Sequence, residues 1–201
     1  MNKLRSITEN EMIAIFLRGE FTSERFSYAI HRQLASLKLR DSVITNPDLD
    51  DASQNKARRR ILSSARGYDQ RTEVFNGFPD DVMWTEVEVT KDELAHVRYI
   101  DYSYWSELTN GSRLPMDAAA TIEAGKEVFG VSNDRFKKAA EAVRAGKQFP
   151  TMILAGEDKN NLVVLEGHLR LTAYALTWKN VPENIKVIIG ISPHMTEWSL
   201  Y

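Results

Sequence analysis

The sequence predicts an α+β protein that is helical in its N-terminal part and mixed α/β in its C-terminal part. Apolar residues recur at helical spacing through residues 8–37. Residues 82–89 alternate, with valines on one side and glutamates on the other, as a half-exposed strand requires. Two apolar runs within 151–165 flank a Gly-containing turn, which is typical of a hairpin. We therefore expect a helical N-terminal extension over 1–80 and an α/β domain over 81–201.

The composition is that of an ordinary globular protein and excludes several classes of function. Of the 201 residues, 43% are hydrophobic and 27% are charged, and there is no low-complexity tract. The formal net charge of -2 gives no overall field that would attract nucleic acid. The absence of cysteine excludes disulfides, zinc sites built on thiolates and a thiol nucleophile.

The apolar segments are too short and too interrupted for a signal peptide or a membrane span. Glu9 and Glu11 interrupt the apolar stretch that ends at Phe16, so a signal peptide is not expected. No run approaches the ~18 apolar residues of a membrane-spanning helix. We therefore expect a cytoplasmic protein with no membrane partner.

Local motifs mark the ends of the N-terminal helices. Thr8 followed by Glu11 predicts a capping box, and Gly67 predicts a helix C-cap. The basic cluster between Lys56 and Arg60 could contact nucleic acid or an acidic partner, although such a run usually forms a solvated helix face. The expected elements are helices over 8–18 and 22–37, a polar loop over 40–53, a basic helix over 56–66 and an ordered connection over 67–79.

The C-terminal part is expected to contain both strands and helices. Thr90 with Glu93 predicts a second capping box, and Ser103 predicts another helix start. The expected elements are strands over 82–89, 151–155, 161–165 and 185–191, and helices over 90–97, 103–110, 116–124, 133–145 and 169–178.

The turn around Gly167 is the strongest candidate for a binding site. Gly167 lies between an apolar strand and a helix start, where free backbone N–H groups and the helix dipole favour an anion. A glycine lets the backbone approach a ligand closely, and Arg170 can hold phosphate oxygens through two parallel hydrogen bonds. The sequence therefore predicts a phosphate site at this turn.

The segment Glu166-Gly167-His168-Leu169-Arg170 resembles the signature of the ParB/sulfiredoxin superfamily, which includes the ParB-like nuclease domains. In that superfamily a strand ends in a Gly-x-x-Arg turn that opens a helix and binds nucleotide phosphates. The resemblance covers residues 82–195 and is sharpest over 149–175. The Glu-Gly-His-x-Arg form is similar to the branch that contains free-serine kinases. The resemblance implies a small mixed sheet with helices, a nucleotide (ATP, ADP or CTP) with Mg²⁺, and a small-molecule acceptor.

The chain departs from two other branches of this superfamily. His168 stands where sulfiredoxins have their reactive cysteine, which excludes repair of sulfinic acids. Leu169 and Thr172 occupy two places that arginines fill in chromosome-partitioning ParB proteins. A clamp gated by CTP is therefore not expected.

The candidate residues each have a functional and a structural interpretation. Glu166 could hold Mg²⁺ or activate a hydroxyl, or it could simply face solvent at a strand end. His168 could be a catalytic general base or phosphate donor, or merely a helix cap. Arg113 lies in a loop where ParB-like domains often place a second ligand contact, or it could merely be exposed. The predicted phosphate-binding set is Gly167, His168, Arg170, Thr172 and Arg113.

Three functions are compatible with these residues. The first is a nucleotide-dependent enzyme, either a phosphotransferase or an NTP hydrolase, with Glu166 and His168 as the catalytic candidates. The second is a DNA-binding or nuclease module, which the net charge disfavours. The third is a non-catalytic module that senses a nucleotide. The sequence leaves the oligomeric state open, a homodimer included.

Overall fold

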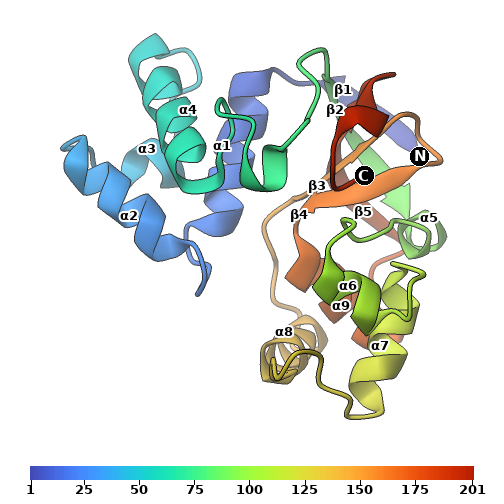
Figure 1. Ribbon diagram of the computed structural model, residues 1–201. Coiled ribbons are helices and arrows are strands. Elements are labelled where there is room, and N and C mark those ends of the chain that lie inside the picture. Colours follow the sequence, from blue (N-terminus) through green and yellow to red (C-terminus); the bar gives the residue numbers. More distant parts are fainter.

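Five strands form one mixed sheet in the computed structural model, which describes residues 1–201 (Figure 1). The order across the sheet is β1-β2-β5-β3-β4. The β3 and β5 strands run parallel, and every other neighbouring pair is antiparallel. The predicted α+β class is confirmed. The strands are β1 (Asn2–Ser6), β2 (Met83–Thr90), β3 (Met152–Gly156), β4 (Leu162–Glu166) and β5 (Asn184–Ile191).

The first strand was not predicted. Every residue of β1 is exposed, so its sequence has no alternation of buried and exposed positions that would indicate a strand. It forms through backbone pairing with β2, from Asn2 opposite Glu88 to Ser6 opposite Thr85. The segment before the first helix therefore supplies an edge of the sheet.

The N-terminal helices follow the predicted pattern with two local differences. The Thr8 side chain accepts the Glu11 N–H, but the Glu11 carboxylate pairs with Arg5, so only half of the predicted box forms. Gly67 ends a helix in the left-handed conformation, as predicted. A short helix, α3, lies within the segment predicted to be a loop. These helices are α1 (Glu9–Glu20), α2 (Ser27–Ser36), α3 (Ser42–Thr45) and α4 (Ala52–Arg66), followed by the 3-10 turn η1 (Glu73–Phe75).

Five further helices surround the other strands. Thr90 and Glu93 form both halves of the predicted capping box. Ser103 is the first residue of its helix, and Tyr102 rather than Ser103 occupies the cap position. The helices are α5 (Lys91–Ala95), α6 (Ser103–Leu108), α7 (Pro115–Glu123), α8 (Asp134–Arg144) and α9 (His168–Leu176), with 3-10 turns η2 (Trp178–Asn180) and η3 (Met195–Glu197).

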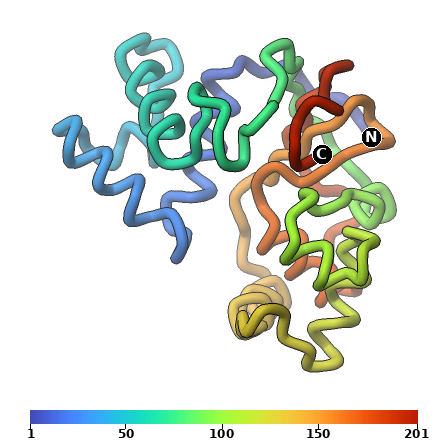
Figure 2. The backbone as a smooth tube through the Cα atoms, in the orientation of Figure 1, coloured from blue at the N-terminus to red at the C-terminus, as the bar shows by residue number.

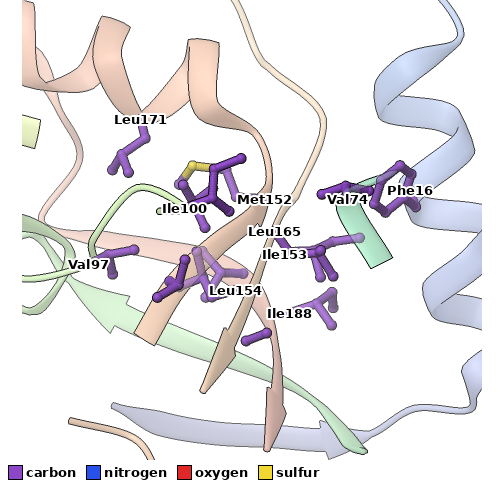
Figure 3. Close-up of a cluster of buried hydrophobic side chains, with 14 of the residues drawn as sticks. Phe16, Val74, Val97, Ile100, Met152, Ile153, Leu154, Leu165, Leu171 and Ile188 are labelled. Atoms are coloured by element: carbon purple, nitrogen blue, oxygen red, sulfur yellow. The ribbon is translucent and has the colours of Figure 1, made fainter. Parts of the chain in front are cut away.

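One hydrophobic core runs through both parts of the chain. It contains 44 buried residues, which extend from α1 to the end of the chain. Figure 3 shows Phe16 and Val74 of the N-terminal part beside Ile153 of β3, with Leu171 and Val97 on the other side of that strand. All residues of β3 and β4 are buried because helices cover both faces of the sheet there. The N-terminal helices therefore share a core with the sheet.

The link between α8 and β3 lies at the border between these two parts. Figure 2 shows residues 145–151 running from α8 up to the sheet along the side that faces the N-terminal helices.

None of the helices combines the length and the apolar character needed to cross a bilayer.

Candidate functional site

Gly167 joins β4 to α9 in a conformation that favours glycine. Its φ is 113°, in the left-handed region. A Cβ atom at this position would lie 2.7 Å from the Met152 Cγ atom. The first backbone N–H groups of α9 have no acceptor within the helix, so they are free to bind a ligand. The strand, turn and helix predicted around Gly167 are all present.

Arg170 points into the protein and not toward a ligand. It is 5% exposed, and one terminal nitrogen donates to the carbonyls of Pro150 and Thr151, the latter at 3.0 Å. The other terminal nitrogen pairs with the Glu166 carboxylate. Arg170 was expected to donate two parallel hydrogen bonds to a phosphate. In the structure its donors instead connect α9 to β4 and to the link before β3.

Glu166 is buried beneath helix α1 and does not face solvent. A Cβ atom on Gly19 would come within 2.9 Å of both carboxylate oxygens, so the α1 backbone lies directly on this side chain. Burial raises the pKa of Glu166, and the neighbouring Arg170 opposes that rise. No group of three or more His, Asp or Glu side chains is placed to hold a metal ion. A Mg²⁺ ion at Glu166 would therefore depend on ligand oxygens for most of its coordination.

Thr172 and Arg113 are engaged elsewhere in the structure. The Thr172 hydroxyl is fully buried, donates to the His168 carbonyl at 2.9 Å and lies 2.7 Å from the Tyr99 hydroxyl. Arg113 donates to the Tyr201 carbonyl at 2.7 Å. Both side chains were predicted to contact phosphate, but Thr172 supports α9 from within the core and Arg113 fastens the C-terminal segment.

His168 is the first residue of α9 and is stacked with two aromatic rings. The centroid of its ring lies 5.3 Å from that of Trp105 and 6.2 Å from that of Tyr99, and the three rings are nearly parallel. Its Nε2 atom is enclosed and has no hydrogen-bond partner. Burial, followed by nearby arginines, lowers the pKa of His168 to about 3. The imidazole is therefore neutral at physiological pH and can donate or accept one proton at Nε2.

A second buried ion pair, Glu20 with Arg66, lies beside Glu166. Glu20 ends α1, Arg66 ends α4, and their charged atoms are 3.6 Å apart. Burial raises the pKa of Glu20 to about 7, the Glu166 charge adds to the rise, and the Arg66 charge opposes it. We call Glu20, Arg66, Glu166 and Arg170 the junction cluster. It connects the N-terminal helices to the turn around Gly167.

Sequence reasoning missed the N-terminal half of the junction cluster. Glu20 lies four residues after Phe16, and Arg66 lies four residues after Leu62, so each charge falls on the apolar stripe of its helix. A charged residue on a buried stripe is the signal that could have identified both residues.

Unsatisfied polar atoms gather around the start of α9. Five buried side-chain nitrogen or oxygen atoms in the protein lack a hydrogen-bond partner. Nε2 of His168 lies at the first residue of α9, Nε of Arg66 belongs to a side chain whose charge acts on His168, and the Tyr104 hydroxyl is on a ring that packs against Trp105, which stacks on His168. The other two atoms are Nε of Arg58 and Oδ1 of Asn133. Buried polar groups are normally paired, so this concentration distinguishes the region from the rest of the core.

Two exposed arginines from separate segments act on the same region. Arg135, in the first turn of α8, lies 5.8 Å from the centroid of the Tyr104 ring. Arg25, in the connection between α1 and α2, lies 5.0 Å from the centroid of the Phe26 ring. Neither forms a salt bridge, and both charges contribute to the lowered pKa of His168. The start of α9 is therefore electropositive.

Half of the basic cluster of α4 is engaged by other groups of the protein. Arg58 is fully buried and donates to the carbonyls of Val43 and Asp48. Arg59 pairs with Glu9 and Asp69. Arg58 and Arg59 therefore have internal partners, whereas Lys56 and Arg60 remain exposed.

Two surface hollows lie away from the junction cluster. One, of about 450 Å³, is lined by Glu93, His96 and Lys159 among others, and another, of about 230 Å³, includes Arg71 and Trp84. Neither contains a concentration of unpaired polar atoms like that at α9. We therefore place the candidate site at the start of α9.

Comparisons of the chain with protein-family models, with curated proteins and with solved structures find no match.

Proposed function

We propose that the protein binds a phosphorylated ligand, a nucleotide, at the N-terminal end of α9. The observation that carries the proposal is the enclosed, unpartnered Nε2 of His168 at a helix N-terminus, together with the unpartnered Nε of Arg66, whose charge acts on His168. Each such atom costs about 1–3 kcal/mol when buried unpaired, so a ligand that pairs with them gains affinity. The helix dipole and the first N–H groups of α9 select an anion.

The local charge supports an anionic ligand although the whole chain is acidic. Four arginines, at positions 25, 66, 135 and 170, act on His168, whereas two carboxylates, Glu20 and Glu166, lie in the junction cluster. Because burial raises the pKa of Glu20 to about 7, its charge offsets only part of this excess at neutral pH. The chain as a whole carries a formal charge of -2. Positive charge is thus concentrated at the proposed site.

The resemblance to the ParB/sulfiredoxin superfamily supports a nucleotide as the ligand. The β3–β4 hairpin, the Gly167 turn and α9 follow one another as the resemblance implies. We propose that the protein adopts this superfamily's fold and catalyses phosphoryl transfer from a nucleotide to a small-molecule hydroxyl or to water. Such a reaction depends mainly on positioned positive charge, which the arginines supply. Glu166 would be the protein ligand of a phosphate-bound Mg²⁺ ion, which would supply charge neutralisation, and Glu20 would accept the proton of the attacking hydroxyl.

A non-catalytic nucleotide sensor is the second candidate. The specific observation that favours it is the pairing of the Glu166 carboxylate with Arg170, which occupies the predicted metal ligand. In this case the nucleotide would bind without turnover. A DNA-binding or nuclease function gains no such support, since Arg58 and Arg59 of the basic cluster have internal partners.

A binding and turnover experiment tests the proposal. Thermal unfolding is followed with ATP, ADP, CTP and GTP, with and without Mg²⁺, because a ligand that binds the native state raises the midpoint by mass action. Arg135→Ala should abolish most of the shift. Lys138→Ala, at another exposed cation of α8, is the matched control and should retain it. If no nucleotide stabilises the wild type, the proposal is wrong. Release of inorganic phosphate, or its transfer, then separates the enzyme from the sensor.

A further inference from the structure

We infer that Arg25, in the connection between α1 and α2, and Arg66, at the end of α4, complete the phosphate site, so that a bound diphosphate or triphosphate bridges the N-terminal part of the chain and α9. This inference rests on the proposed function and adds the N-terminal part of the chain to the ligand-binding site. It assigns the N-terminal helices a direct contact with the ligand, beyond their share in the hydrophobic core.

Arg66 is buried but poorly satisfied. It is 9% exposed, and its guanidinium carbon lies 3.7 Å from the centroid of the Phe26 ring. Its contact with the Glu20 carboxylate is 3.6 Å, longer than a hydrogen bond, and its Nε has no partner. A guanidinium offers five N–H donors, so this side chain retains donors for an additional acceptor.

Arg25 lies near Arg66 through a shared aromatic contact. Both guanidinium groups pack against Phe26, Arg25 at 5.0 Å and Arg66 at 3.7 Å from the ring centroid. This arrangement holds two like charges on one ring, which cation–π attraction stabilises only in part. Since Arg25 is exposed and has no carboxylate partner, an anion placed between the two arginines would relieve their repulsion.

Arg135 of α8 and His168 of α9 belong to the C-terminal part of the chain. The charges of Arg25, Arg66 and Arg135 all act on His168, whose Nε2 has no partner, so the three arginines lie around the start of α9. The contact of Gly19 with Glu166 fixes the end of α1 against this region. Figure 1 shows the end of α1 and the start of α2 on the side of the N-terminal helices that faces the link to β3 and α8.

The number of charges indicates a ligand with more than one phosphate group. Three arginines, at positions 25, 66 and 135, lack a hydrogen-bonded carboxylate partner, and they come from three separate segments. A single phosphate group carries about 1.5–2 negative charges at pH 7 and could not contact all of these segments as readily as a diphosphate. Pyrophosphate is the simplest probe of this class.

The test measures pyrophosphate and ADP affinity by titration calorimetry on the full chain. Arg25→Ala removes one charge-assisted hydrogen bond and should weaken both ligands by about tenfold, while Arg25→Lys should retain part of the affinity. Arg32→Ala, at an exposed arginine of α2, is the matched control and should change affinity by less than about twofold. Because Arg25 is exposed, its replacement should leave folding intact.

The outcomes separate the inference from the function on which it rests. If the wild type binds neither pyrophosphate nor any nucleotide, the proposed function fails and the inference fails with it. If the wild type binds, and Arg135→Ala weakens binding while Arg25→Ala does not, the site lies on α8 and α9 alone and only the inference is overturned. Weakening by both variants, with Arg32→Ala unchanged, supports the bridging site.

Discussion

Two buried arginines of α4 show how differently one helix can use the same side chain. Arg58 is fully buried, and both of its terminal nitrogens donate hydrogen bonds, to the Val43 carbonyl at 3.1 Å and to the Asp48 carbonyl at 2.8 Å. Arg66, two turns later, has a single carboxylate at 3.6 Å. Both arginines have an unpaired Nε, and the difference lies in their terminal nitrogens, which form hydrogen bonds in Arg58 but not in Arg66. A buried charge whose terminal nitrogens are hydrogen-bonded stabilises the fold, whereas one whose terminal nitrogens are spare points to a ligand.

The same contrast separates Arg170 from Arg66 within the junction cluster. Arg170 pairs with Glu166 and with two backbone carbonyls, so we place it with Arg58 among the arginines that hold the structure. The comparison therefore predicts large losses of stability at Arg170 and Arg58. At Arg66 it predicts a small loss of stability and a large loss of ligand binding.

The largest effect is expected from Arg170→Ala. The substitution leaves the Glu166 carboxylate buried without its partner, and should lower the free energy of unfolding by about 3–5 kcal/mol. Denaturant unfolding measures the loss. Arg144→Ala, at an exposed arginine of α8, is the control and should be nearly neutral. Replacing both partners, Glu166→Leu with Arg170→Met, should recover part of the stability, and no recovery would contradict the pairing as the cause.

Arg58→Ala should have the next largest effect. It leaves the Val43 and Asp48 carbonyls without their donors and opens a cavity in the N-terminal helices, which should cost about 2–4 kcal/mol. Arg60→Ala, at an exposed position of the same helix, is the matched control. Nucleotide affinity, measured below the unfolding temperature, should be unchanged in both variants. A loss of nucleotide affinity in Arg58→Ala but not in Arg60→Ala would show that Arg58 contributes to ligand binding and would contradict the distinction between Arg58 and Arg66.

The sequence predicted the local part of this architecture and missed its long-range contacts. The Thr90–Glu93 box and the Gly167 turn are set by residues a few positions apart, so their patterns can be recognised in the sequence. Strand β1 has no pattern because it is exposed and depends on a partner strand 80 residues away. The pairing of Glu20 with Arg66 likewise depends on the packing of α1 against α4.

The inward turn of Arg170 shows a different limit of sequence reasoning. Its spacing from Glu166 is compatible with an ion pair, and its position after Gly167 is equally compatible with a phosphate contact. The burial of Glu166 decides between them, because a buried carboxylate requires a partner. That burial depends on Gly19 of α1, which no local motif indicates.

Glu20 should make stability depend on pH. Its pKa in the folded protein is raised from 4.5 to about 7, so the folded state holds this proton more tightly than the unfolded state. The stabilisation is fully present below pH 4.5 and is lost as the pH rises through 7, by about 2 kcal/mol between pH 5 and 8. His168, whose pKa is lowered to about 3, acts in the opposite direction, since its contribution is lost as the pH falls below 6.5.

Glu20→Gln isolates this contribution. The difference in unfolding free energy between the wild type and the variant should change across pH 5 to 8, because His168 is common to both and cancels. Glu24→Gln, at an exposed carboxylate nearby, should show no such change. A constant difference for Glu20→Gln would mean that Glu20 does not carry a proton near neutrality and cannot serve as the proposed proton acceptor.

Arg66→Gln should have the smallest effect on stability and tests the comparison most directly. Removal of the buried charge relieves its desolvation, and Glu20, whose pKa already lies near 7, can take up a proton when its partner is lost. At pH 6 we therefore expect a loss of only about 1 kcal/mol, less than for Arg58→Ala. The stabilisation by pyrophosphate, measured in the same unfolding experiment, should largely disappear. Arg66→Gln could instead destabilise the protein as much as Arg58→Ala and still be stabilised by pyrophosphate. In that case both arginines are structural, and the unpaired donors of Arg66 do not bind the ligand.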